Sequence, residues 1–211
     1  MNFEQLVEKA SSLVCFGPSF LAAGEDIENV RVQVSRWVDT GRLLRIAKGL
    51  YTLAEPWRKV AADPFVIANT LKTPSYVSLQ SALSYYGMIP EFVPVITSIT
   101  TARPGTIETP LGRYDYRHVK KPLFWGYTTA EADAGGQIFM ASPEKALLDL
   151  FWLTKGSDSP GFIDELRLQN TAQIDREQLR VYFRREEKPK LIRALKHLER
   201  MLDEEEDTAN A

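Results

Sequence analysis

Seven polar side chains in the first quarter of the chain have the chemistry needed to contact double-stranded DNA. Four belong to a predicted helix that starts near Ile27, namely Arg31, Gln33, Ser35 and Arg36. Arginine can donate two hydrogen bonds to guanine, and glutamine can pair with adenine, so these side chains suit the base edges of a major groove. The remaining three lie in a predicted β-hairpin and suit phosphates or an adjacent minor groove: Arg42, Arg45 and Lys48.

The distribution of charge supports this hypothesis although the net charge of the chain is −2. Residues 31–48 contain five basic side chains and one acidic one, which gives a local charge of +4. Residues 203–207 have the sequence DEEED and carry −5. A nearly neutral protein can therefore present a basic surface near its N-terminus.

Helices and a hairpin that could position these side chains are predicted in the order of a winged helix-turn-helix. A first helix starts near Phe3, a Gly17-Pro18 break follows, and a short helical piece over residues 20–23 ends at Gly24. The helix from Ile27 has an apolar face for docking, and Gly41 ends it. Two short strands around Lys48-Gly49 complete the arrangement. The apolar face comprises Ile27, Val30, Val34, Trp37 and Val38.

The rest of the chain predicts a mixed α/β domain and then helices, so the fold class is α+β. Ser78 is expected to cap a helix, residues 93–101 and 113–119 are expected to be strands, and shorter strands are expected near 124–128 and 137–141. In 113–119, Tyr114, Tyr116 and His118 share one face. Four segments are predicted: a winged helix-turn-helix at 1–55, a mixed α/β domain at 63–156, a helical extension at 160–204 and a disordered acidic tail at 205–211.

Five segments, in order, resemble the AbiEi-type antitoxins, the regulator half of abortive-infection toxin–antitoxin pairs. Together they cover roughly residues 19–156. In one place the chain departs from the pattern, since Ala47-Lys48-Gly49 stands where many relatives have a second arginine before the glycine. The segments are SRWVDTGRLLRIAKGLYTL, YVSLQSALSYYGMIPE, ITSITTARPG, TPLGRYDYRHVKKPLFWGY and MASPEKALLDLFWL.

The resemblance implies a repressor that binds repeats in its own promoter through the winged helix, and it implies a role in phage defence. It also implies that the second domain counters a nucleotidyltransferase-like toxin encoded beside it, either with or without a stable complex. An alternative is a winged-helix regulator that has no toxin partner. The site predicted from the residues themselves consists of the seven DNA-contacting side chains given above, with no cofactor and no metal.

A metal-dependent nucleic-acid enzyme is the less favoured alternative. Glu186-Glu187-Lys188 matches a nuclease triplet by letter, but it lies in a charged junction rather than on a strand. His118, His197 and Cys15 are too few for a zinc site without carboxylates. No P-loop pattern and no Gly-x-Ser-x-Gly motif occurs. We therefore expect no catalytic residues.

Three further features have structural interpretations. In Ser142-Pro143-Glu144-Lys145, the serine, the proline and the acid favour the start of a helix, although Glu144 and Lys145 could also contact a partner. The leucines at 191, 195, 198 and 202 need a partner helix, within the chain or in a homodimer. The absence of a signal-like segment or a long apolar run predicts a cytoplasmic protein without membrane contact.

Overall fold

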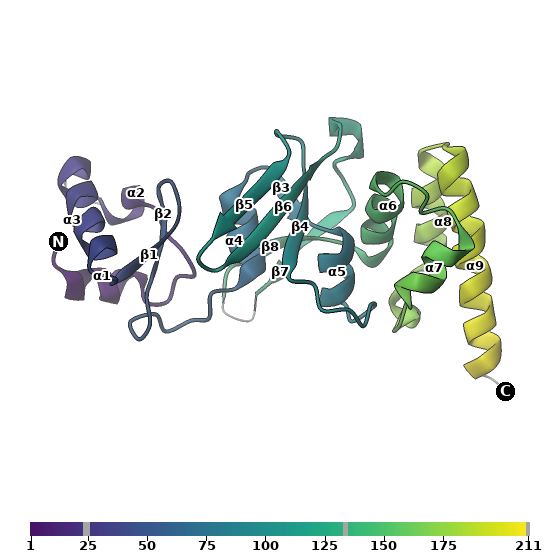
Figure 1. Ribbon diagram of the computed structural model, residues 1–211, viewed down its shortest axis with the longest axis horizontal. Helices are drawn as coiled ribbons and strands as arrows, with labels where there is room; N and C mark the ends of the chain where they lie inside the picture. The colour runs from purple at the N-terminus through teal and green to yellow at the C-terminus, as the bar shows by residue number, and fades with distance from the viewer. Residues whose placement is uncertain (23–25, 133–134, 210–211) are drawn as a thin grey trace.

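The computed structural model describes residues 1–22, 26–132 and 135–209. It has an α+β fold that is elongated, and the chain runs from one end to the other (Figure 1). Helices and a hairpin form the N-terminal end, a mixed sheet occupies the middle, and helices form the C-terminal end. None of the helices in the described part of the chain is long and apolar enough to cross a membrane.

The first block contains three helices followed by a hairpin: α1 (Phe3–Ala10), α2 (Pro18–Leu21), α3 (Ile27–Asp39), β1 (Leu43–Ala47) and β2 (Leu50–Leu53). The Asp26 side chain accepts a hydrogen bond from the Glu28 backbone N–H and so caps α3. Gly41, with φ of +69°, follows the helix as predicted. The predicted helical piece at 20–23 begins earlier, at Pro18, and Gly24 lies outside the described residues.

The helices and the hairpin of this block enclose a core of their own. Val30, Val34 and Trp37 of α3 are buried, as the apolar periodicity predicted. They pack with residues from α1, α2 and the hairpin, which fixes the side of α3 that faces outward. Those residues are Leu6, Ala10, Phe16, Leu21, Leu43 and Leu53.

The central sheet has six strands in the order β5-β6-β4-β3-β8-β7 and is mixed. The pairs β3–β8 and β4–β6 are parallel, and the other neighbours are antiparallel. The strands are β3 (Ser75–Val77), β4 (Val95–Thr100), β5 (Gly105–Thr109), β6 (Gly112–His118), β7 (Tyr127–Glu131) and β8 (Gln137–Ala141).

Helices α4 (Pro64–Leu71) and α5 (Leu79–Tyr85) pack on opposite faces of this sheet. The Tyr116 hydroxyl donates to the Ala68 carbonyl of α4 at 2.6 Å. The alternation predicted for β6 is confirmed for the two tyrosines, because Tyr114 and Tyr116 are buried. His118, predicted on the same face, is exposed, and its Nδ1 lies 3.1 Å from the Ala102 carbonyl oxygen.

The remaining helices are α6 (Pro143–Leu153), α7 (Pro160–Leu166), α8 (Arg176–Arg185) and α9 (Pro189–Ala209), with single 3-10 turns at η1 (Lys121–Leu123) and η2 (Thr171–Gln173). The four leucines of α9 are buried against the other helices of the same chain. This leucine face is therefore covered internally and does not offer the surface expected for a homodimer through this helix. The sheet and the helices α6 to α9 share one hydrophobic core, so the segment from residue 160 is not a separate extension.

Two local predictions need correction. The strand predicted near residues 124–128 is displaced, since the 3-10 turn η1 ends at Leu123, Gly126 adopts φ of +74°, and β7 covers Tyr127–Glu131. The acidic segment from residue 205 is helical to Ala209 rather than disordered. Asp203 pairs with Arg176, and Glu205 accepts a hydrogen bond from Thr171 at 2.7 Å, so contacts with α8 and η2 hold the end of α9.

Candidate nucleic-acid interface

The predicted site residues of α3 are spread around its outward side. Arg31, Ser35 and Arg36 are exposed, whereas Gln33 is half-buried. The Oε1 atom of Gln33 is buried and has no hydrogen-bond partner among the described residues. Of the four predicted residues on α3, three are therefore available at the surface and one lies at its edge with an unsatisfied acceptor.

The two arginines of α3 differ in their electrostatic surroundings. Arg31 forms an ion pair with Glu28, one helical turn earlier, and both side chains are well exposed. Arg36 has no carboxylate partner within the described parts of the chain. Since a neighbouring carboxylate competes with any incoming anion, Arg36 is the better placed of the two to bind one.

Two further residues of this face, Asn29 and Val32, were not predicted from the sequence. Together with Asp26, Gln33 and Arg36 they line a shallow pocket of about 390 Å³. Positions 29, 32, 33 and 36 follow the i, i+3, i+4, i+7 spacing of one helix face, and this spacing is a signal that could have identified them. Valine forms no side-chain hydrogen bonds, so a search for polar groups does not find Val32.

The predicted hairpin is present, and it lies beside α3. Leu43 pairs with Leu53, and Gly49 at the turn has φ of +76°, which glycine adopts at no steric cost. Arg45 and Lys48 are exposed, with Lys48 at the turn itself. Neither has a carboxylate partner in the described residues, so the strand and the turn present two available cations.

Arg42 occupies a different place from the other cations of the hairpin. It precedes β1, and its guanidinium carbon lies 4.8 Å from the centre of the Phe3 ring. Phe3 in turn packs against Trp37 and Trp57 at ring-centre distances of 5.7 and 5.3 Å. Arg42 is exposed but rests on this aromatic cluster, so it helps to hold α1 against the hairpin base.

The residues considered for catalysis do not come together. Within the described residues, no group of three histidines, cysteines or carboxylates is placed to hold a metal ion. Cys15 is half-buried, and burial raises the pKa of its thiol although a hydrogen bond with Thr70 opposes this effect. Glu186 and Glu187 follow the end of α8, with Glu187 in the left-handed backbone region.

The Ser142-Pro143-Glu144-Lys145 segment starts α6, as the structural interpretation predicted. The Ser142 hydroxyl accepts a hydrogen bond from the Lys145 backbone N–H at 3.3 Å. The buried Glu144 carboxylate accepts one from the backbone N–H of Asp175 at 2.8 Å and so links α6 to the cap of α8. Glu144 and Lys145 are both buried, so neither side chain is available to a partner at the surface.

Lys145 belongs to a buried polar cluster that the sequence did not predict. Its ammonium group pairs with Asp149, which also accepts hydrogen bonds from Tyr76 at 3.0 Å and Ser78 at 2.8 Å. Burial raises the pKa of Asp149, while Lys145 and the two hydroxyls act in the opposite direction. The Lys145 ammonium also lies 4.9 Å from the Trp125 ring centre. Helix α6, strand β3, the N-cap of α5 and the loop before β7 meet at these groups.

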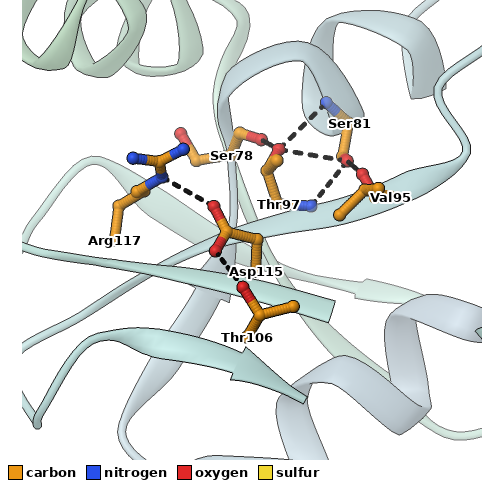
Figure 2. A network of polar contacts seen from close by, with 7 residues as sticks. All are labelled: Ser78, Ser81, Val95, Thr97, Thr106, Asp115 and Arg117. Carbon is orange, nitrogen blue, oxygen red and sulfur yellow. Dashed lines mark hydrogen bonds and ion pairs between the residues drawn. The ribbon is translucent and has the colours of Figure 1, made fainter. Parts of the chain in front are cut away.

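Ser78 and Ser81, at the start of α5, both make structural hydrogen bonds. Ser81 and Thr97 are joined by mutual hydrogen bonds, and Ser81 also donates to the Val95 carbonyl at 3.3 Å (Figure 2). Ser78 occupies the cap position of α5, but its hydroxyl bonds to Asp149 instead of capping the helix. These contacts fasten α5 to β4.

A second polar group lies on the same face of the sheet, on the neighbouring strands. Asp115 of β6 accepts hydrogen bonds from Thr106 at 2.9 Å and from Arg117 at 2.6 Å (Figure 2). Arg117 is therefore paired within its own strand. The arginines of the sheet do not add available cations beside α3.

Comparison with known proteins adds a fold relationship. No protein-family model and no curated protein matches the sequence. Among solved structures, the crystal structure of the RV2827C protein from Mycobacterium tuberculosis is similar, with a TM-score of 0.55 and 14% sequence identity. The match covers 92% of this chain and 76% of that one. At this identity the similarity shows a shared fold.

Proposed function

We propose that this chain is a sequence-specific DNA-binding regulator whose first block acts as a winged helix-turn-helix. In this proposal α2 and α3 are the paired helices, α3 enters the major groove, and the β1–β2 hairpin is the wing. The observation that carries the proposal is the joint exposure of Arg36 on α3 and of Arg45 and Lys48 on the hairpin, without carboxylate partners among the described residues.

The order of the elements supports the proposal, since helix, helix, helix and hairpin is the succession that a winged helix-turn-helix requires. A further contact favours a fixed wing. Phe16, between α1 and α2, forms a short antiparallel bridge with Tyr51 of β2, with backbone hydrogen bonds of 2.8 and 2.9 Å. This bridge ties the hairpin to the helices, so that the cations of both can contact one duplex.

The proposal is tested by measuring affinity for duplex DNA from upstream of its own reading frame, at several salt concentrations. Removing one phosphate contact should reduce the log–log salt slope by about 0.9, so a variant with Arg36, Arg45 and Lys48 changed to alanine should bind weakly with a shallower slope. A control variant with three exposed cations elsewhere, Arg103, Lys155 and Lys196, changed to alanine has the same change in charge. Equal weakening in both variants, or binding that ignores salt, would contradict the proposal.

We further propose an AbiEi-type antitoxin role, in which the regulator represses its own operon and counters a nucleotidyltransferase-like toxin. The five resembling segments support it. The test is co-expression of the full chain, carrying the three DNA-face alanines, with the toxin gene beside it. Rescued growth supports the role. Persistent arrest despite a folded antitoxin leaves a regulator without a toxin partner as the better proposal.

A further inference from the structure

Val32 occupies the centre of the outward face of α3. Its neighbours around the helix are Glu28 and Ser35 on one side and Asn29 and Arg36 on the other, each three or four positions away. Val32 is 53% exposed, although Val30 and Val34, two positions before and after it, are buried. The apolar face of α3 therefore docks into the core without using Val32.

An exposed valine contributes little to the stability of α3. Its β-branched side chain restricts χ1 in a helix, so many polar residues would serve a purely solvated position as well or better. Polar groups surround it, and the pocket of about 390 Å³ that it shares with Asn29, Gln33 and Arg36 opens beside it. Among these groups the Gln33 Oε1 is an acceptor without a donor among the described residues. The surface thus combines one apolar group with side-chain amides at a fixed spacing.

This combination matches the edge of an A·T pair in the major groove. Thymine is the base that presents an apolar group there, its C5-methyl, and adenine presents an N6 donor beside an N7 acceptor. A side-chain amide can satisfy both adenine groups, and the exposed Asn29, which lines the same pocket as Val32, carries one. Arg36, one turn after Val32, lies at the next position along the groove.

We infer that Val32 contacts a thymine methyl group in the bound duplex, with the amide of Asn29 on the adenine of that pair or its neighbour. The inference rests on the proposed function and assigns α3 an A·T-containing half-site. Val32 is then a specificity-determining residue, whereas Arg31, held by Glu28, contributes less to base recognition.

The experiment starts with the full chain and a library of random duplexes, from which bound sequences are selected. Each thymine of the consensus is then replaced by deoxyuridine, which lacks only the C5-methyl. At one position we expect affinity to fall about fourfold, the effect of burying one methyl-sized group. A second duplex has 5-methylcytosine paired with guanine at that position. It keeps the methyl group in the major groove but replaces adenine, so it separates the methyl contact from the adenine contact.

Substitutions at Val32 identify the residue responsible. In Val32→Ser and Val32→Asn, whose side chains have no methyl group, deoxyuridine at that position should cause little further weakening, because the apolar partner of the thymine methyl has already gone. Val181→Ala is the matched control, since Val181 is a 61% exposed valine on α8, and it should keep the full deoxyuridine effect. Circular dichroism of each variant verifies that the fold is intact.

The outcomes separate the two proposals. Specific, salt-dependent binding in which no thymine is sensitive to deoxyuridine overturns the thymine contact and leaves the regulator proposal standing. A deoxyuridine effect that persists unchanged in Val32→Ser and Val32→Asn assigns the methyl to another residue and also overturns it. Failure to select any sequence, with equal binding of all duplexes, rejects the proposed function and this inference with it.

Discussion

Lys145 and Asp149 form an ion pair one helical turn apart on α6, and their side chains are 0% and 3% exposed. The pair lies where α6 meets β3, since Tyr76 and Ser78 donate to the same carboxylate. Trp125 covers the ammonium group on one side, and the Arg185 guanidinium lies 4.3 Å from the centre of the same ring. The Ser-Pro-Glu-Lys sequence that starts this helix thus includes a lysine that serves the interior of the protein.

Replacing Lys145 by methionine should lower the free energy of unfolding by about 3–5 kcal/mol, because the Asp149 carboxylate would remain buried without its cation. Chemical denaturation measures the change. Lys121→Met, at an exposed lysine, is the control and should stay within about 0.5 kcal/mol of the wild type. Wild-type stability in Lys145→Met would show that the pair contributes no net stabilisation at this site.

Gly126→Ala should destabilise the same cluster from the outside. A Cβ at this position would lie 2.9 Å from the Cγ and Cδ atoms of Lys145, and Gly126 has φ of +74°. Overpacking and backbone strain together predict a decrease of about 1–3 kcal/mol in stability in the same denaturation assay. Gly49→Ala is a useful comparison, because its φ is +76° but nothing lies within 4 Å of the added atom. A Gly126→Ala effect no greater than that of Gly49→Ala would argue against crowding by Lys145.

The two arginines of α3 should contribute unequally to DNA binding. Arg36→Ala should cost about 1–3 kcal/mol of binding free energy if the arginine contacts a base. Arg31→Ala should cost less, since Glu28 already neutralises that guanidinium. Glu28→Gln should strengthen binding by removing a carboxylate from the DNA face and releasing Arg31. Titration of labelled duplex at fixed salt compares the three variants, and a larger effect in Arg31→Ala would refute the ranking.

Cys15 should react slowly with iodoacetamide at pH 8 in the folded protein. Burial raises the pKa of the thiol above its ordinary value, so less of the reactive thiolate exists at that pH than in the unfolded chain. As the pH rises through the raised pKa, the alkylation rate should increase and approach that of the denatured protein. Mass spectrometry follows the modification with time. Equal rates in native and denatured protein at pH 8 would contradict a shielded thiol.

Local patterns in the sequence were sufficient for several elements of the fold. The apolar spacing of α3 predicted the burial of Val30, Val34 and Trp37, although Ile27 and Val38 of the same predicted face are only half-buried. The Lys48-Gly49 pair predicted the hairpin turn. Likewise, Ser142 caps α6 by accepting a hydrogen bond from the Lys145 N–H. These features depend on residues within a few positions of one another, because helix periodicity, caps and tight turns are determined by local geometry.

Contacts between distant segments decided the remainder. The sequence placed Arg42 with the other hairpin cations, but the Phe3 ring lies beneath it. The spacing of the leucines in α9 indicated that they need a partner helix but not which one. In the structure α6, α7 and α8 cover them. The meeting of Tyr76 with Asp149 spans 73 positions and follows from the packing of α6 on the sheet. Residue spacing carries no signal for such pairs, since they exist only when the layers have packed and excluded water from between them.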